Sequence, residues 1–343
     1  MIGRLLRIVI VWELLWAFGI ALALHAFADW PWGTASAAGA GTPLGVHACL
    51  VALGFARGWS SGSPTPDRHR LGILGAARLY LGELTSSLVA FQVRMPWMET
   101  RPLPGVAAFE PCADHVHSGL HAGAPAGARP AAVPVLLIHG YLCNRQIWRP
   151  MAVFLAARGH PIDAMDLEPP FGSIDAYAPS IAAAIDRLRE RTGAARVALV
   201  CHSMGGLAAR AYLRSFGDDA IAHVVTLGTP HRGTVAARSG IGINAAQMRI
   251  GSDWLDALAS AETEATGALF TVVLSHHDNV VMPQAGQTLH GARTVEVGGI
   301  GHVRLSDEPR VLQAVAAALQ DKSGEDIERL PTDRGADSRS RSG

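Results

Sequence analysis

The sequence predicts an α/β fold in which helices cover both faces of a mostly parallel sheet. From residue 133 onward, short apolar runs alternate with segments of helical periodicity. Glycine-rich or polar segments follow several of these runs directly, and the sites of parallel sheets lie at the carboxyl ends of their strands. We therefore expect one α/β domain over residues 133–320, with its functional site at a single edge of the sheet.

The composition excludes two broad classes of protein. The 343 residues include 29 basic and 29 acidic side chains, so no net charge favours binding to nucleic acid. The four cysteines show no paired spacing, which argues against a disulfide scaffold.

Residues 1–60 are predicted to form a membrane segment of one or two helices. Ile8 to Phe27 is apolar apart from Glu13 and His25, and twenty helical residues can cross a hydrocarbon core of ~30 Å. A second uncharged run, Thr34 to Ala56, is long enough to return. We expect Glu13 to lie near the interface or to pair with a neighbour.

The basic residues favour two spans with both ends in the cytoplasm, because the loop between the runs carries none. The basic residues on either side of the two apolar runs are Arg4, Arg7, Arg57, Arg68, Arg70 and Arg78. Two alternatives stay open. A single span would leave the rest of the chain outside the cytoplasm, and cleavage at the small-residue site Ala26-Phe27-Ala28 would release a secreted protein.

Residues 61–132 are predicted to be a juxtamembrane helix and a linker. Leu71 to Val93 is apolar and helical in pattern, and it could lie along the membrane surface or pack on the α/β domain. Glu99 to Ala132 is rich in Pro, Gly and Ala, as in a linker. Its cysteine and histidines, Cys112, His115, His117 and His121, lack a standard zinc spacing, so no metal is expected. Residues 321–343 are polar and predicted to be disordered.

The α/β domain divides into alternating strands and helices. Strands are expected at residues 133–138, 161–165, 196–200, 221–227, 269–274 and 293–297, and helices at 147–158, after Ser173 and over 311–319. A long apolar insertion covers about residues 233–267. It would be either a mobile lid over the site or a fixed cap packed on the core.

The segment Val197 to Arg210 has the pattern of a nucleophile elbow. Apolar residues lead into a tight turn at Ser203, and small residues, Gly205 and Gly206, open the following helix. Cys201 stands where glycine is usual, and the alternative is an ordinary turn with a buried serine.

A second loop could supply hydrogen-bond donors to the same place. Gly140, in His139-Gly140-Tyr141, permits a sharp turn after the first strand and leaves the Tyr141 amide free. The Met204 amide, at the start of the helix after Ser203, could point to the same place as the Tyr141 amide. Two such donors would stabilise an oxyanion, although a turn without a ligand is the alternative.

His302 is the best candidate for a general base among 15 histidines. It follows the last strand and the flexible loop 298–301, whereas His202 should point away from the serine. His276 and His277 end a strand and could be structural. Asp278 follows the preceding strand and is the best acid to orient His302, with a turn-capping aspartate as the alternative.

These motifs, in this order, resemble the alpha/beta-hydrolase superfamily and in particular bacterial lipases and esterases. The resemblance covers roughly residues 133–319 and includes the segment Leu227 to Thr234. It implies that Ser203 is the nucleophile, His302 the base and Asp278 its partner, with Tyr141 and Met204 as oxyanion donors. The supporting motif residues are His139, Gly140, Cys201, His202 and Gly205.

The expected function is that of a membrane-anchored serine hydrolase acting on lipid or other acyl esters, without a cofactor or an obligate protein partner. The resemblance suggests the inner membrane of a bacterium, with the domain cytoplasmic for two spans and periplasmic for one. An acyltransferase or thioesterase with the same residues is the first alternative. A binding protein that keeps the fold without the activity is the second.

Overall fold

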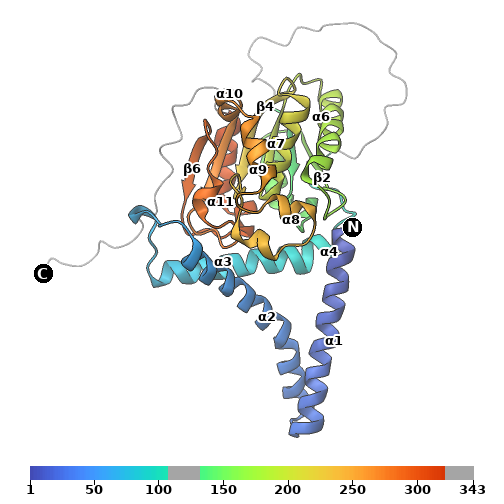
Figure 1. The fold of residues 1–343 in the computed structure, drawn as a ribbon. Helices are drawn as coiled ribbons and strands as arrows, with labels where there is room; N and C mark the ends of the chain where they lie inside the picture. The colour runs from blue at the N-terminus through green and yellow to red at the C-terminus, as the bar shows by residue number, and fades with distance from the viewer. Residues whose placement is uncertain (107–131, 321–343) are drawn as a thin grey trace, which may run out of the picture.

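The computed structural model describes residues 1–106 and 132–320 (Figure 1). Its centre is a six-stranded sheet in the order β2-β1-β3-β4-β5-β6, in which all neighbouring strands are parallel. The strands are β1 (Val135–Ile138), β2 (Ile162–Met165), β3 (Val197–His202), β4 (Ile221–Leu227), β5 (Phe270–Ser275) and β6 (Arg293–Val297). The predicted parallel α/β sheet is confirmed.

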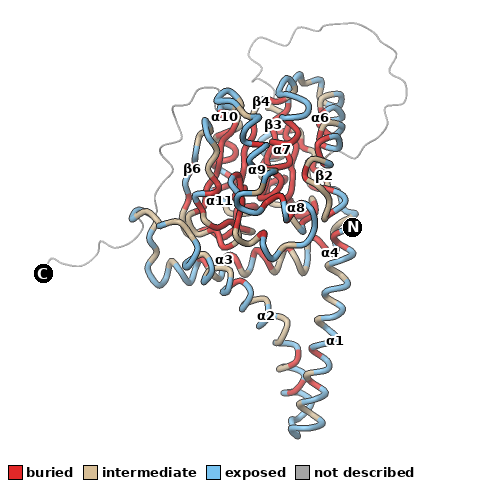
Figure 2. The backbone as a smooth tube through the Cα atoms, in the orientation of Figure 1, coloured by how far each residue is buried: buried red, intermediate tan, exposed pale blue. Residues whose placement is uncertain are grey.

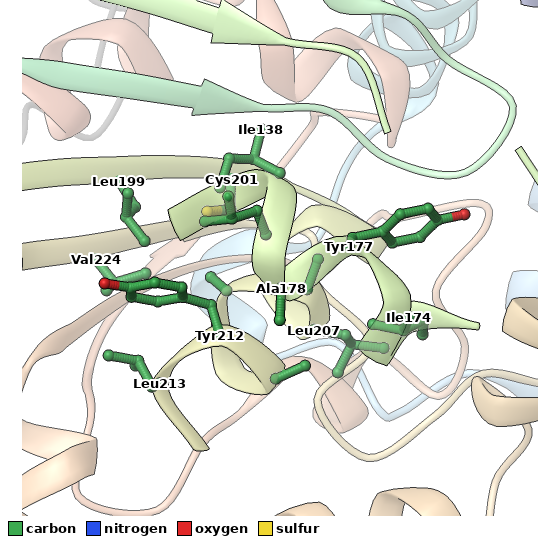
Figure 3. Close-up of a cluster of buried hydrophobic side chains, with 14 of the residues drawn as sticks. Ile138, Ile174, Tyr177, Ala178, Leu199, Cys201, Leu207, Tyr212, Leu213 and Val224 are labelled. Carbon is green, nitrogen blue, oxygen red and sulfur yellow. The ribbon is translucent and has the colours of Figure 1, made fainter. Parts of the chain in front are cut away.

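Helices cover both faces of the sheet, as predicted. Alternate residues of β1 face opposite sides, because side chains of a strand alternate. Leu136 packs with α6 (Ala178–Thr192) and α7 (Met204–Phe216) in the cluster shown in Figure 3. Leu137 packs on the other face with α5 (Arg149–Ala156) and α11 (Pro309–Gln320). The short helical turns of the domain are η3 (Arg145–Trp148), η4 (Ile174–Tyr177), η6 (Gln284–Gln287) and η7 (Val303–Ser306).

The insertion between β4 and β5 is a packed cap in this structure. It contains η5 (Val235–Ser239), α8 (Ile243–Gln247), α9 (Asp253–Ser260) and α10 (Glu264–Ala268). Backbone hydrogen bonds join Ile243 N to the Phe171 oxygen (3.0 Å) and Asn244 N to the Gly172 oxygen (3.1 Å). These bonds fix α8 to the loop after β2.

Two long helices, α1 (Ile2–Ala28) and α2 (Trp32–Ser61), form a hairpin that projects from the domain (Figure 1). Both are long and apolar enough to cross a membrane, by length and composition alone. Most of their surface is exposed (Figure 2), and the residues buried between them are small: Ala17, Ala21, Ala35 and Gly39. Small residues allow apolar helices to approach closely. Glu13 pairs with a neighbour, since its carboxylate accepts a hydrogen bond from Gln92 Nε2 at 3.0 Å.

The base of the hairpin is docked on the domain, because the Met1 ammonium donates to Glu168 Oε1 at 2.9 Å. The Arg7 guanidinium donates to the Pro96 carbonyl oxygen at 2.6 Å, and Ile2 is buried. Beyond α2 come the short turn η1 (Asp67–His69) and then α3 (Ile73–Leu88), which continues through the π-helical turn η2 (Val89–Arg94) into α4 (Met95–Trp97). This helix runs between the hairpin and the domain (Figure 1).

The start of the expected linker packs on the domain. Leu103 is buried, and the Arg101 carbonyl oxygen accepts a hydrogen bond from Gln146 Nε2 at 2.8 Å. The rest of that linker, with Cys112, His115, His117 and His121, lies outside the described residues, as does the expected disordered tail, residues 321–343.

Candidate active site

Ser203 occupies a strained turn between β3 and α7. Its backbone lies at φ 55° and ψ −125°, a conformation that costs a residue with a side chain about 1–3 kcal/mol. After Met204, positions 205 and 206 must be glycine, because a Cβ at Gly205 would collide with the Ile138 carbonyl oxygen and one at Gly206 with the Thr229 side chain. The strand–turn–helix of the elbow pattern is therefore present, with Ser203 at its apex.

Cys201, at the unusual position of the elbow motif, is a packing residue in this structure. Its side chain is buried in the cluster of Figure 3, beside α6 and α7. Burial raises the pKa of the Cys201 thiol, which keeps it protonated and unreactive. The cluster has room for a small side chain here, so the turn does not require glycine at this position.

Gly140 brings the loop after β1 against Ser203. A Cβ at Gly140 would lie 2.7 Å from Ser203 Cβ and 3.3 Å from Ser203 Oγ, so a larger residue would push the loop away. Tyr141 follows in this loop. Met204 is the first residue of α7, where a backbone amide has no acceptor within the helix. The two amides predicted to bind an oxyanion thus flank the serine.

His139 fixes the orientation of the Gly140–Tyr141 peptide. Its Nε2 accepts the Leu167 amide at 3.0 Å, so Nδ1 carries the proton and donates to the Gly140 carbonyl oxygen at 2.8 Å. Burial lowers the pKa of His139, which favours this neutral form. In a planar trans peptide the carbonyl and the following N–H point in opposite directions. Holding the Gly140 oxygen therefore also orients the Tyr141 N–H.

The Tyr141 side chain has a role that the sequence did not indicate. Its hydroxyl donates to the Ile241 carbonyl oxygen at 2.8 Å and accepts the Ile241 amide at 3.0 Å. The loop beside the serine is thereby tied to the cap.

His302 and Asp278 form a buried pair, with His302 Nδ1 2.8 Å from Asp278 Oδ2. The other carboxylate oxygen accepts the Val280 and Val281 amides at 2.8 and 2.7 Å. Because Nδ1 donates to a carboxylate, Nε2 remains to accept a proton. Burial alone would lower the pKa of His302, but the Asp278 carboxylate raises it above its ordinary value.

The loop after β4 joins the serine to this pair. The Leu227 oxygen accepts the Ser203 amide at 2.9 Å, and a Cβ on the next residue, Gly228, would lie 3.1 Å from His302 Nδ1 and 2.9 Å from Asp278 Oδ2. Gly228 has a φ of +56°, which glycine adopts without strain. The structure therefore places Ser203 and the bonded Asp278–His302 pair against the same loop, at the carboxyl ends of the strands.

Residues around His302 hold its backbone on several sides. His202 contacts His302: its Nε2 lies 3.0 Å from the His302 carbonyl oxygen, and the ring centroids are 4.6 Å apart. Burial lowers the pKa of His202 to about 3, so the neutral ring donates this bond. The His302 amide donates to Asn279 Oδ1 at 2.9 Å.

Two further residues bond the backbone near His302: Glu83, which the sequence motifs do not indicate, and His277, which is not the predicted base. Glu83, on α3, accepts the amides of Val303 and Arg304. No local signal identifies it, because its partners lie about 220 residues away in the chain. His277 is structural, with Nδ1 accepting the Gly299 amide at 3.0 Å.

One group of side chains could hold a metal ion among the described residues. Ligand atoms of His69, His276 and Glu296 lie within 4.8 Å of one another. The Arg68 guanidinium already pairs with the Glu296 carboxylate. Glu296 lies on the edge strand β6, His276 directly follows β5 and His69 ends η1, so this group is separate from Ser203, which follows β3.

Comparisons with known proteins agree with the fold. A family profile described as alpha/beta hydrolase fold matches residues 133–249. A triacylglycerol lipase of Burkholderia plantarii is 27% identical over 238 residues, which cover 58% of this chain and 65% of that lipase.

Two solved structures share the fold. The mature form of a Bacillus licheniformis lipase matches 56% of this chain and 93% of its own, with a TM-score of 0.51 and 16% identity. Lipase B of Aspergillus fumigatus matches 59% of this chain and 56% of its own, with a TM-score of 0.50 and 16% identity. The predicted alpha/beta-hydrolase fold is confirmed.

Proposed function

Since the chain has the alpha/beta-hydrolase fold and is similar to lipases, we propose that it is a membrane-anchored serine hydrolase of lipid or other long-chain acyl esters. The observation that carries the proposal is the buried Asp278–His302 pair, joined through the Gly228 loop to a serine in a strained elbow. A buried serine that served only packing would not need this backbone conformation or this neighbouring pair.

In the proposed reaction, Ser203 Oγ attacks the ester carbonyl while His302 Nε2 takes the hydroxyl proton. Asp278 stabilises the resulting imidazolium and keeps the proton on Nδ1. The Tyr141 and Met204 amides bind the oxyanion of the tetrahedral intermediate. His302 then gives its proton to the leaving alcohol, and water, activated by the same histidine, releases the acid from the acyl-enzyme.

The position of the hairpin supports an apolar ester as the substrate. The end of α2 packs on the loop that holds Asp278: a Cβ at Gly54 would lie 3.0 Å from the Asn279 oxygen, and one at Gly58 would lie 3.5 Å from the Asp278 oxygen. The site edge of the sheet therefore faces the two candidate spans (Figure 1). We place the domain on the cytoplasmic side, since the basic residues flank the hairpin and none lies in its loop.

The test uses the full chain in detergent micelles with a chain-length series of nitrophenyl esters. Ser203→Ala should abolish hydrolysis and labelling by a fluorophosphonate while leaving the thermal unfolding midpoint unchanged. Ser180→Ala, an exposed serine on α6, serves as the matched control and should behave like the wild type. Labelling that persists in Ser203→Ala would refute the assignment. Product analysis with added alcohol or thioester separates hydrolysis from acyl transfer.

A further inference from the structure

Glu83 reaches from α3 into the loop that carries His302. Its side chain is buried (1% exposed), and the two carboxylate oxygens accept the amides of Val303 and Arg304, each at 3.0 Å. These are the first two amides of η7, directly after His302. On the other side of His302, a Cβ at Gly301 would collide with the Glu83 carboxylate. The carboxylate thus touches the chain on both sides of the histidine.

A simple cap for a short helical turn does not require this arrangement. Side chains of Ser, Thr, Asp or Asn within the turn itself commonly satisfy such amides. A carboxylate from a distant helix carries a desolvation cost that burial imposes on any charge. Its placement beside His302 therefore suggests a function connected with that residue.

The helix that carries Glu83 has reversed amphipathic character. The face toward the domain includes the polar side chains Glu83 and Ser86, both buried. The opposite face carries Leu74 (76% exposed) and Leu81 (57% exposed). A helix on a water-soluble domain normally buries its apolar stripe. An apolar outer face next to the hairpin is typical of a helix that lies in a membrane interface.

We infer that Glu83 is a positioning residue for His302, through which the docking of α3 on the domain sets the place of the catalytic base. This inference rests on the proposed function. It connects the membrane-proximal helix to the reaction by two hydrogen bonds, without contact between Glu83 and the substrate.

The charged groups around His302 and Glu83 determine how removal of the Glu83 carboxylate would change the pH dependence of the reaction. His302 faces Asp278, Glu83 and the neutral His202. Glu83 faces His302, Asp278 and the backbone of Arg304, whose guanidinium pairs with Glu308 at 2.8 Å. Both carboxylates raise the pKa of His302. Because the base must be neutral, kcat/KM of the wild type should fall as the pH drops through a value above about 6.5.

Glu83→Gln tests the inference in the full-length protein. The amide keeps the size of the side chain and one acceptor, but it removes the charge and one hydrogen bond. We expect kcat to fall about tenfold or more with KM within twofold of the wild type, because a displaced base loses alignment with the serine. The acid limb of kcat/KM should move to lower pH, since a negative charge beside His302 is lost.

Ser86→Ala is the matched control. Ser86 lies on the same face of α3, donates to Asp307 Oδ1 at 2.9 Å and accepts from the Arg304 guanidinium at 3.3 Å, so it docks the helix without bonding the two amides after His302. This variant should keep the wild-type acid limb and a kcat within twofold. A wild-type profile in Glu83→Gln would overturn the inference. So would equal losses in both variants without a shift of the limb, because they would indicate docking alone.

Glu83→Asp decides the matter if Glu83→Gln does not fold. The shorter side chain keeps the charge but loses reach, so kcat should fall while the acid limb stays in place; an unchanged kcat would overturn the inference. Failure of the proposed function is distinguishable from these results. It would appear as hydrolysis that survives Ser203→Ala, whereas the inference alone fails when that variant is inactive and Glu83→Gln is not impaired.

Discussion

Ser203 keeps its unfavourable backbone conformation because both of its peptide groups are held from outside the turn. The Leu227 oxygen accepts its amide, and Thr229 Oγ1 donates to its carbonyl oxygen at 2.8 Å. Strain of this kind persists only where the surroundings over-determine the conformation. The loop after β4 therefore stabilises the strained backbone of Ser203, and it also contacts the Asp278–His302 pair through Gly228.

His139 should matter for catalysis beyond its contribution to stability. His139→Ala removes the shorter of two hydrogen bonds to the Gly140 carbonyl oxygen, leaving that from the Cys143 amide at 3.4 Å, and loosens the peptide that carries the Tyr141 amide. Loss of one oxyanion donor costs 10²–10³-fold in kcat, so a loosened donor should cost about 10- to 100-fold. Steady-state kinetics with a nitrophenyl ester measure the effect.

The control is His160→Ala. His160 is also buried, and its Nδ1 also bonds a backbone oxygen, that of Val133 at 2.8 Å, but it lies before β2 at the opposite end of the sheet. Both variants should lose thermal stability, and only His139→Ala should lose kcat. Comparable kinetic losses in the two would show that His139 acts through stability alone.

Some residues of the candidate site could be predicted from a local sequence pattern, and others could not. Ser203 could be predicted because a tight turn needs small neighbours, and His302 and Asp278 because each follows a strand of a parallel sheet. Glu83 could not, since its partners are distant in sequence and its own helix resembles any apolar helix. The orientation of His202 toward His302 likewise depends on packing that the sequence does not display.

At the scale of elements, the cap is fixed to the sheet by charge as well as by backbone hydrogen bonds. Arg210, on α7, is buried and donates to both carboxylate oxygens of Glu262, at 2.6 and 2.7 Å. It also donates to the His231 carbonyl oxygen at 2.9 Å. The pair connects α7, which begins beside Ser203, to the turn between α9 and α10.

Glu262→Ala should destabilise the domain strongly, because it leaves a buried guanidinium with only one of its acceptors. Breaking such a pair from one side costs about 3 kcal/mol, which corresponds to a fall of roughly 6–12 °C in the unfolding midpoint. Glu190→Ala, which removes an exposed carboxylate from α6, should shift the midpoint by less than about 2 °C. Differential scanning fluorimetry of the two variants in one detergent makes the comparison. Equal midpoints would mean that the cap is held without this ion pair.

The positions of the helices and strands could be predicted from the sequence more readily than the way they pack together. Apolar periodicity predicted the six strands and the helix that became α3, because burial on a sheet or a helix face leaves that periodic signal. It left open whether α3 packs on the domain or lies on a membrane, and the structure indicates why. One face of α3 packs on the domain with polar side chains, and the other leaves Leu74 and Leu81 exposed. Hydrophobic periodicity does not show which of the leucines face the domain: Leu79 is buried, whereas Leu74 and Leu81 are exposed.

At the scale of the whole molecule, the hairpin and the site lie on the same side of the domain. The first turns of α1 are docked on α4, beside the domain, through Arg7, and the other end of α1 continues into the far loop of the hairpin (Figure 1). Both ends of the hairpin are therefore on the side of the domain. A membrane around α1 and α2 would lie next to α3 and to the edge of the sheet where Ser203, Asp278 and His302 meet.

This arrangement makes a topology with two spans testable. A cysteine at Gly33, in the exposed loop end of the hairpin, should react with a membrane-impermeant maleimide in intact bacterial spheroplasts. A cysteine at Arg187, exposed on α6, should react only after the cells are lysed. The background is cleared by Cys49→Ala and Cys112→Ser, and Cys143 and Cys201 are buried.

The expected result follows from the charges, since the basic residues flank the hairpin and cytoplasmic loops are those rich in arginine. Labelling of the Arg187→Cys variant before lysis would instead place the domain outside the cytoplasm, as for a single span. Loss of the first 28 residues, measured by the mass of the purified protein, would indicate cleavage and a secreted enzyme. Cleavage would remove the membrane from beside α3, and the exposed Leu74 and Leu81 would then require a protein partner.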